Sequence, residues 1–181
     1  LLHVYTDGSV MINHGGTEMG QGLYIKVAQV VAEVLQIDIE RVKITATRTD
    51  KVPNTSATAA SSGADINGKA AEAAALSIKE RLTKFAAEYY GAKTSDVTFL
   101  PNRIRIGNQV VAFRDLVHLA YMSRISLSAT GYYRTPKIHY DADTLTGRPF
   151  YYFAYGAAVS EVMIDTLTGE NKVTAVDILH D

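Results

Sequence analysis

The stretch HVYTDGSVMINHGGTEMGQGLYIKVAQVVAEVL, residues 3–35, contains the signals that decide the fold. Residues 3–6 and 10–13 predict two short strands, and Asp7-Gly8 between them is a strong hairpin-turn signal. Apolar residues then recur at helical spacing, which predicts a helix at about residues 20–36 with this buried face: Leu23, Val27, Val30 and Val34. A glycine-rich loop therefore joins a β-hairpin to a helix.

Three further segments follow this stretch in the first half of the chain. Residues 41–47 alternate as a strand does, and residues 49–63, rich in Thr, Ser, Asn and Ala, predict a loop. A long helix is predicted at about residues 64–90, with Gly91 where a C-cap glycine belongs. Its predicted apolar face consists of Ala71, Ala75, Ile78, Leu82, Phe85 and Tyr89.

The second half of the chain is predicted to be mostly β. A small meander should precede an amphipathic helix at 113–122, its strands being residues 97–100, 103–106 and 109–112. β-branched and aromatic residues dominate from Ser126 onward, which predicts strands to the end, including a packed strand at Tyr151–Tyr155.

One pentapeptide occurs twice in this half. DTLTG stands at residues 143–147 and again at 165–169, as expected of one turn used in two hairpins. The predicted fold class is α+β, with hairpins and a mixed sheet packed by two long helices.

The composition excludes several classes of site. The chain has 181 residues and a net charge of −1, so no nucleic-acid partner is expected, and no apolar run reaches membrane-span length, so no membrane partner is expected. Cysteine is absent, which rules out thiolate zinc sites and cysteine nucleophiles in this chain and fits a reducing compartment. No histidine lies within five residues of another, so a metal site built by this chain alone is not expected.

Two loops carry the candidate chemistry. The loop at residues 14–22 precedes a helix, whose N-terminal N–H groups and dipole favour anions; the alternative is a strained turn with no ligand. The loop at 54–63 offers hydroxyls that could grip phosphate or a polar heterocycle. For this second loop, ordinary N-capping by Ser61, Ser62 or Asp65 is the favoured interpretation from the residues alone.

Together these loops resemble the xanthine dehydrogenase and aldehyde oxidase family. GGTEMGQGL at residues 15–23 is similar to the family's molybdopterin-contacting motif, and VPNTSATAAS at 52–61 resembles its second cofactor segment. SLSATGYYRTP at 126–136 and YFAYGAAVSE at 152–161 resemble the xanthine dehydrogenase branch more than aldehyde oxidases. The four motifs stand in the family's order, and the resemblance runs over essentially the whole chain.

The resemblance implies roles for individual residues. In the first loop, Met19 and Gln21 would lie along the molybdopterin, with Gly16, Gly20 and Gly22 completing this cofactor-binding segment. In the second, the pterin or phosphate would be held by Thr58 and Ser61, and small side chains at Ala59 and Ala60 would leave room for a purine at the molybdenum end. Glu18 is expected to cap the loop, and its truncation is expected to matter less than that of Gln21.

The resemblance also implies what the whole protein does. It would be a molybdopterin (Mo) oxidoreductase of purine metabolism that oxidises hypoxanthine and xanthine with water as oxygen source. Iron–sulfur (2Fe-2S) and FAD groups would be held by other domains or subunits, which together with the rest of the molybdenum domain would be its partners. The pyranopterin dithiolene would hold the metal, and the location would be cytoplasmic.

Residues 1–181 are expected to be a fragment of the molybdenum cofactor-binding domain of a larger chain. A strand signal at 172–181 stops without a turn, and the family's general-base motif is absent, so no catalytic residue is expected in this segment and the isolated fragment should be inactive. Two alternatives stay open: a fragment of an aldehyde oxidase-type hydroxylase, and a non-catalytic domain that retains the fold.

Overall fold

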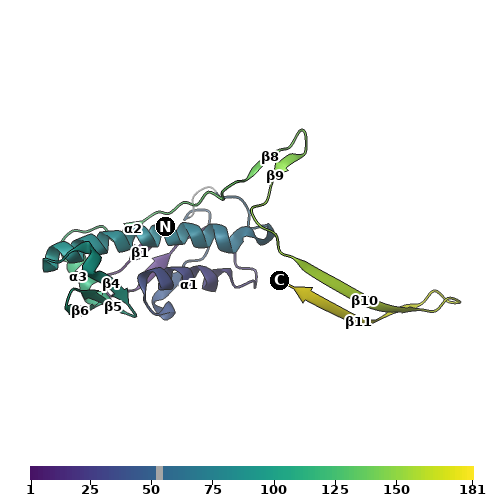
Figure 1. The fold of residues 1–181 in the computed structure, drawn as a ribbon, viewed down its shortest axis with the longest axis horizontal. Coiled ribbons are helices and arrows are strands. Elements are labelled where there is room, and N and C mark those ends of the chain that lie inside the picture. Colours follow the sequence, from purple (N-terminus) through teal and green to yellow (C-terminus); the bar gives the residue numbers. More distant parts are fainter. Residues whose placement is uncertain (52–54) are drawn as a thin grey trace. The chain divides into compact units, whose positions relative to one another are not determined.

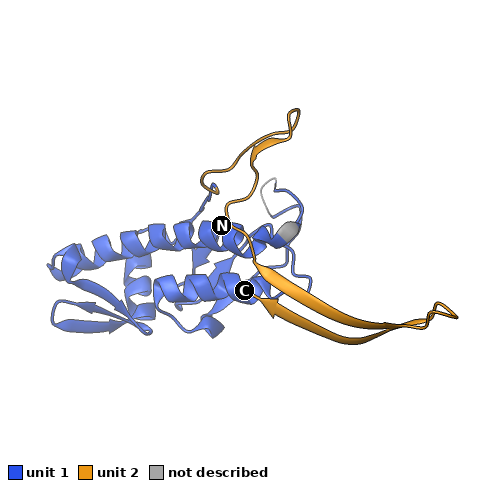
Figure 2. Ribbon diagram, turned by 45° about the vertical axis from the view of Figure 1, so that its right-hand side comes forward, with its two compact units in different colours: residues 1–134 blue, residues 135–181 orange. Residues whose placement is uncertain are grey.

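The structure, a computed structural model, describes residues 1–51 and 55–181, with only the backbone of Ala60 (Figure 1). The chain divides into two compact units, residues 1–134 and 135–181 (Figure 2). The first contains all the α-helices of the described residues together with two sheets, and the second consists of two β-hairpins. The α+β prediction is confirmed.

A four-stranded mixed sheet lies in the first unit, in the order β3-β2-β1-β7. Strands β1 (Leu2–Val4) and β2 (Val10–Ile12) form the predicted hairpin, with Gly8 at a φ of 81° in its turn. Strand β3 (Val42–Ile44) runs parallel to β2, and β7 (Ser128–Ala129) runs antiparallel to β1. The combination of one parallel and two antiparallel pairings gives the mixed sheet that the sequence predicted.

Two long helices, α1 (Leu23–Leu35) and α2 (Gly63–Tyr90), pack against this sheet and each other. Helix α1 begins three residues later than predicted, because Gly20 and Gly22 have φ values of 95° and 76°, which an α-helix cannot contain. Its fully buried row is shifted from the predicted one and consists of Leu23, Val27, Val31 and Leu35.

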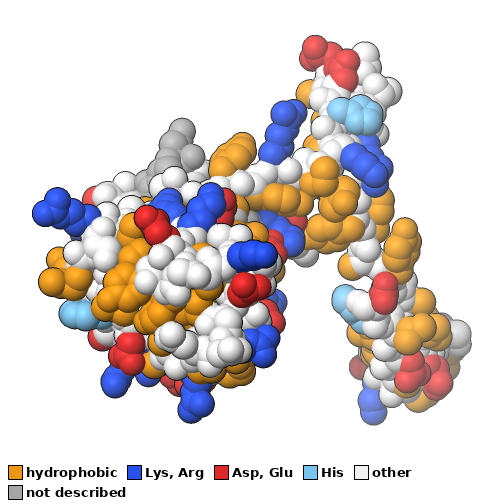
Figure 3. Space-filling view, turned by 60° about the vertical axis from the view of Figure 1, so that its left-hand side comes forward, with side chains coloured by type: hydrophobic (Ala, Val, Ile, Leu, Met, Phe, Trp, Pro, Cys, Tyr) orange, Lys and Arg blue, Asp and Glu red, His pale blue; other side chains and the backbone are white. Residues whose placement is uncertain are grey.

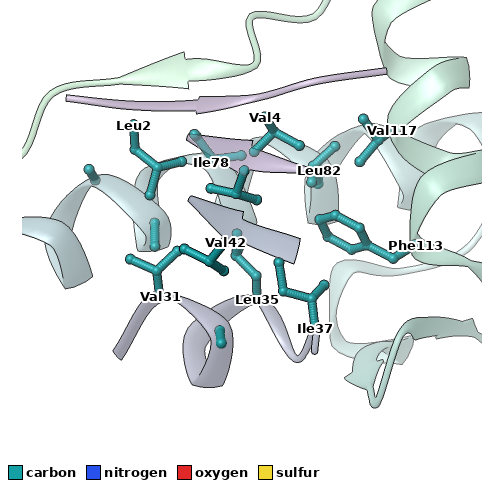
Figure 4. Packing of buried hydrophobic residues seen from close by; sticks show 14 of the residues in the cluster. Leu2, Val4, Val31, Leu35, Ile37, Val42, Ile78, Leu82, Phe113 and Val117 are labelled. Atoms are coloured by element: carbon teal, nitrogen blue, oxygen red, sulfur yellow. The ribbon is translucent and has the colours of Figure 1, made fainter. Parts of the chain in front are cut away.

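One hydrophobic core connects these elements (Figure 4). Ile78 and Leu82 of α2 are completely buried, as are Val31 and Leu35 of α1. Burial of each such side chain stabilises the fold by about 1.5–3 kcal/mol. The prediction for α2 is correct except at Tyr89 near the end of the helix, which is 55% exposed although its ring centroid lies 5.5 Å from that of Phe85.

The meander and third helix have the predicted bounds. Strands β4 (Val97–Leu100), β5 (Arg103–Ile106) and β6 (Gln109–Ala112) form an antiparallel sheet, and α3 (Phe113–Met122) follows directly. Short 3-10 turns precede β3, α2 and β4: η1 (Ile39–Arg41), η2 (Ala60–Ser62) and η3 (Thr94–Asp96).

The second unit contains the hairpins β8–β9 (His139–Asp141, Thr146–Arg148) and β10–β11 (Gly156–Ile164, Asn171–His180). Hydrophobic side chains gather on the exposed surface of this unit (Figure 3). The strands predicted after Ser126 are present, but residues 130–138 and 149–155 between them are irregular and include Pro136 and Pro149, which cannot donate ladder hydrogen bonds. The Tyr151–Tyr155 segment is irregular and exposed rather than a packed strand.

The repeated DTLTG pentapeptide forms two hairpin turns in different registers. In the second turn, Asp165 Oδ1 accepts from the N–H groups of Leu167 and Thr168, at 2.8 and 3.2 Å. In the first, the equivalent acceptor is Asp141, two residues before the pentapeptide. The pentapeptide therefore recurs in two hairpins, but the turn is not the same one, because Asp141 lies outside the repeat and Asp165 is its first residue.

Candidate functional site

The two loops singled out in the sequence contact each other directly. The Thr17 N–H donates to Thr58 Oγ1 at 2.8 Å, joining the loop before α1 to the loop before α2. Close packing accompanies this bond, because a Cβ at Gly15 would collide with the Thr55 side chain. A Cβ at Gly16 would lie 2.5 Å from Leu23 Cδ2, so this position also requires glycine unless that side chain moves.

The Glu18 carboxylate holds the first loop to the start of α1. Its Oε1 accepts from the Gly20 and Gly22 N–H groups at 2.9 and 3.0 Å, and its Oε2 accepts from Tyr24 N–H at 3.0 Å. These donors, that of Tyr24 foremost, lower the pKa of the Glu18 carboxyl from its ordinary 4.5. The prediction that Glu18 caps the loop is confirmed.

Gln21 and Met19 lie on the outer side of the same loop. Gln21 Oε1 accepts from the Met19 N–H at 2.6 Å, and its Nε2 donates to the Thr17 carbonyl at 2.9 Å. The Met19 side chain is 66% exposed, and no atom lies within 4 Å of where a Cβ would stand on Gly20. An amide and a thioether are therefore presented to solvent beside an open backbone.

Behind the loop lies a network that sequence reasoning missed. His14 Nδ1 accepts from the Gly16 N–H at 3.0 Å, and its ring meets that of Tyr24 edge-on, with centroids 5.4 Å apart. Thr47 Oγ1 donates to the Gly16 carbonyl at 2.7 Å and lies 3.1 Å from the Tyr24 hydroxyl. Thr47 has a single hydroxyl proton, so Tyr24 is the donor in the second bond. The one signal in the sequence for this network is that His14 directly precedes the first glycines of the loop.

A cavity of about 190 Å³ borders both loops on this inner side. Asn13, His14, Thr55 and Asn67 are among its lining residues. Asn13 Oδ1 and His14 Nε2 are buried and have no hydrogen-bond partner within the described residues. Burial also lowers the pKa of His14 from its ordinary 6.5.

The predicted residues of the second segment lie at the start of α2. Ala59 and Ser61 are exposed and Thr58 is half-buried, while Ala60 begins η2. Ser62 is the N-cap of α2 but makes no side-chain capping hydrogen bond, so capping by Ser62 is not observed. Residues 52–54, the first three of the predicted segment, lie outside the described residues.

Within residues 1–51 and 55–181, no group of His, Cys, Asp and Glu side chains is placed to hold a metal ion. In the same part of the chain, none of the helices has the length and hydropathy needed to cross a membrane.

Comparison with known families covers the whole chain, both loops included. The model of the molybdopterin cofactor-binding domain family matches residues 1–181. The chain belongs to this family. The relationship covers every element described above, from β1 to β11.

The relatives of this molybdopterin cofactor-binding chain are much longer proteins. It is 46% identical over 181 residues to xanthine dehydrogenase/oxidase of Felis catus and 44% identical to xanthine dehydrogenase of Oryza sativa subsp. japonica. It is 42% identical to aldehyde oxidase 2 of Mus musculus. In each case all of the chain is covered, and it spans 12% of the relative's length.

Solved structures share the fold of this molybdopterin cofactor-binding chain. Quinoline 2-oxidoreductase from Pseudomonas putida 86 superimposes with a TM-score of 0.78 at 23% identity, over 99% of this chain and 22% of that one. The Cu,Mo-CO dehydrogenase gives the same TM-score at 24% identity, with the same coverage. At these identities the likeness supports the fold alone.

Proposed function

We propose that residues 1–181 form part of the molybdenum cofactor-binding domain of a xanthine dehydrogenase-type hydroxylase and supply two of its cofactor-binding loops. The observation that carries the proposal is the Thr17–Thr58 hydrogen bond, because it joins the two segments that match the family's cofactor motifs. Family membership over the whole chain supports the same conclusion.

The residues at the joined loops suit such a group. Gln21 can both donate and accept, the Met19 thioether is a soft, polarisable contact, and the glycine between them leaves open space. When bound, the molybdenum cofactor supplies the redox chemistry, and the protein positions it.

This chain's own residues would bind and orient the cofactor. Gln21 and Met19 contact its pterin from the first loop, and Thr58 and Ser61 bind pterin or phosphate from the second. Gly16, Gly20 and Gly22 allow the close approach, while Ala59 and Ala60 leave space for the substrate. Thr58 has a second function, since its hydroxyl oxygen also holds the Thr17 amide.

The complete enzyme would oxidise hypoxanthine and xanthine with oxygen from water. Electrons would leave through 2Fe-2S and FAD groups in other domains or subunits, and the catalytic base would lie outside this chain. Identities of 46% and 44% to two xanthine dehydrogenases, together with the resemblance of residues 126–136 and 152–161 to that branch, support the purine substrate. A cytoplasmic location stays a prediction.

The test is to purify the complete enzyme and measure its molybdenum content and its turnover of xanthine, hypoxanthine and an aromatic aldehyde. Bound molybdenum with preferential purine turnover is the expected result. Preferential aldehyde turnover would assign the aldehyde oxidase alternative. If protein made in a host that synthesises the molybdenum cofactor contains no molybdenum, the non-catalytic alternative is the one that remains.

A further inference from the structure

The glycine loop satisfies most of its own backbone donors. Within residues 16–24, side chains of this chain accept hydrogen bonds from six N–H groups: Gly16, Thr17, Met19, Gly20, Gly22 and Tyr24. A phosphate-binding glycine loop works differently, because its N–H groups point outward to the anion. The sequence predicted that backbone amides before this helix would attract an anion. In the structure, side chains of the chain itself accept hydrogen bonds from these amides.

Glu18 occupies the place of that anion. Helix α1 starts after Gly22, which has no side chain to cap it, and the first N–H groups of a helix have no partner within the helix. The carboxylate accepts from Gly22 and Tyr24 at this end and from Gly20 in the loop, at 2.9–3.0 Å. A full negative charge here offsets the positive end of the helix dipole, which is equivalent to roughly half an elementary charge.

We propose, on the basis of the function proposed above, that Glu18 is a positioning residue of the cofactor site. It acts as a built-in anion that fixes the glycine loop and excludes the cofactor's phosphate from the N-terminus of α1.

This assignment determines which chemistry the loop can recognise. Its outward groups are neutral, namely the Gln21 amide and the Met19 thioether. Gln21 keeps one amide hydrogen beyond the one that binds the Thr17 carbonyl. The loop therefore suits the neutral, hydrogen-bonding edge of a heterocycle, and a phosphate must bind elsewhere.

The role of Glu18 also bears on the expected effect of substitutions. The sequence favoured Gln21 as the sensitive position and Glu18 as a tolerant one. Three backbone bonds to one carboxylate add a cost at Glu18, because its truncation leaves three N–H groups without their acceptor. Glu18→Gln keeps an acceptor oxygen without the charge, and Glu88→Ala, at an exposed position of α2, is the matched control.

The first experiment measures amide hydrogen exchange in the cofactor-free complete protein, with and without inorganic phosphate. We expect Glu18→Ala to accelerate exchange at Gly20, Gly22 and Tyr24 by roughly tenfold or more. Glu18→Gln should be intermediate, and Glu88→Ala should match the wild type. Phosphate should not slow exchange at these amides in the wild type. Unchanged exchange in Glu18→Ala, or phosphate protection in the wild type, would overturn the proposal.

The second experiment measures molybdenum per polypeptide and melting temperature in the same variants. Glu18→Ala should lower molybdenum content severalfold at a nearly unchanged melting temperature, with partial rescue in Glu18→Gln. Wild-type molybdenum content in Glu18→Ala contradicts a positioning role, and so does equal loss in both variants. If the wild type itself binds no molybdenum, the proposed function fails, while the exchange data still decide whether Glu18 fixes the loop.

Discussion

Thr17 and Thr58 are 41 residues apart in the chain, yet the amide of the first donates to the hydroxyl oxygen of the second at 2.8 Å. The bond fixes one of the two proposed cofactor loops relative to the other. A ligand that contacts both loops therefore meets them in a defined arrangement, which reduces the ordering cost of binding.

Removal of this acceptor should loosen the site without unfolding the protein. Thr58→Val keeps the shape of the side chain but cannot accept from Thr17, at a cost of about 0.5–1.5 kcal/mol. We expect molybdenum content to fall severalfold in Thr58→Val and to stay near the wild-type value in Thr58→Ser, which retains the hydroxyl. Elemental analysis of the three purified proteins checks this. Equal molybdenum content in all three would show that the Thr17–Thr58 bond does not contribute to cofactor binding.

Gly131 should be highly sensitive to substitution. A Cβ at this position would collide with the backbone of α2 at Ala70 and Ala74, which cannot move as the end of a side chain can. Gly131→Ala should cost about 1–3 kcal/mol or more by overpacking. Gly107 has a φ of 56° but open space around it, so Gly107→Ala should cost only about 1–2 kcal/mol. Thermal unfolding of both variants compares them directly, and a smaller loss for Gly131→Ala would contradict this packing.

Acid should weaken the glycine loop through His14. Burial lowers the pKa of this imidazole from 6.5, and its neutral Nδ1 accepts from the Gly16 N–H. Because the folded pKa lies below the unfolded one, the unfolded state binds the proton more readily. The stability due to neutral His14 is thus complete above about pH 6.5 and is lost as the pH falls from there through the folded-state pKa.

The measurement is the melting temperature between about pH 5 and 7.5, a window that the ordinary His pKa defines. The wild type should lose stability toward the acid end, and His14→Gln should show a flatter profile because its amide does not titrate. Parallel profiles for the two proteins would show that His14 does not couple protonation to folding.

Local signals explain where sequence-based prediction succeeded. The meander β4–β6 was predicted to the residue because Asn102 and Gly107, which have φ values of 58° and 56°, interrupt strongly β-forming runs. The start of α1 was misplaced because apolar periodicity does not reveal backbone conformation, and Gly20 and Gly22 delay the helix. After Ser126 the β-forming composition does give strands, but the segments 130–138 and 149–155, each with a proline, stay irregular between them.

The candidate site was predictable only in part, because local signals do not show which distant residues meet. The family resemblance predicted both loops as cofactor segments, which stays a prediction, and Glu18 could be predicted as a cap because it lies within the loop it caps. The bond from Thr17 to Thr58 and the contact of Thr47 with Gly16 span 41 and 31 residues. Such pairings depend on how helices and sheet pack, and no local pattern in the sequence encodes them.

Gln21 should contribute to cofactor binding far more than to the stability of the cofactor-free protein. Its side chain is exposed and bridges the Thr17 carbonyl and the Met19 N–H within one loop, so Gln21→Ala should lower the free energy of unfolding by less than about 1 kcal/mol. In the complete enzyme the same substitution leaves a desolvated cofactor group unpaired, at about 1–3 kcal/mol. Roughly tenfold less molybdenum or turnover should follow.

Gln21→Glu keeps the acceptor for Met19 but loses the amide donor, so it should fold normally and still bind the cofactor weakly. Gln29→Ala, an exposed glutamine of α1, controls for loss of a surface amide. Molybdenum content, xanthine turnover and melting temperature of the four proteins separate these effects. If Gln21→Ala retains the molybdenum and turnover of Gln29→Ala, the outer side of the glycine loop does not hold the cofactor.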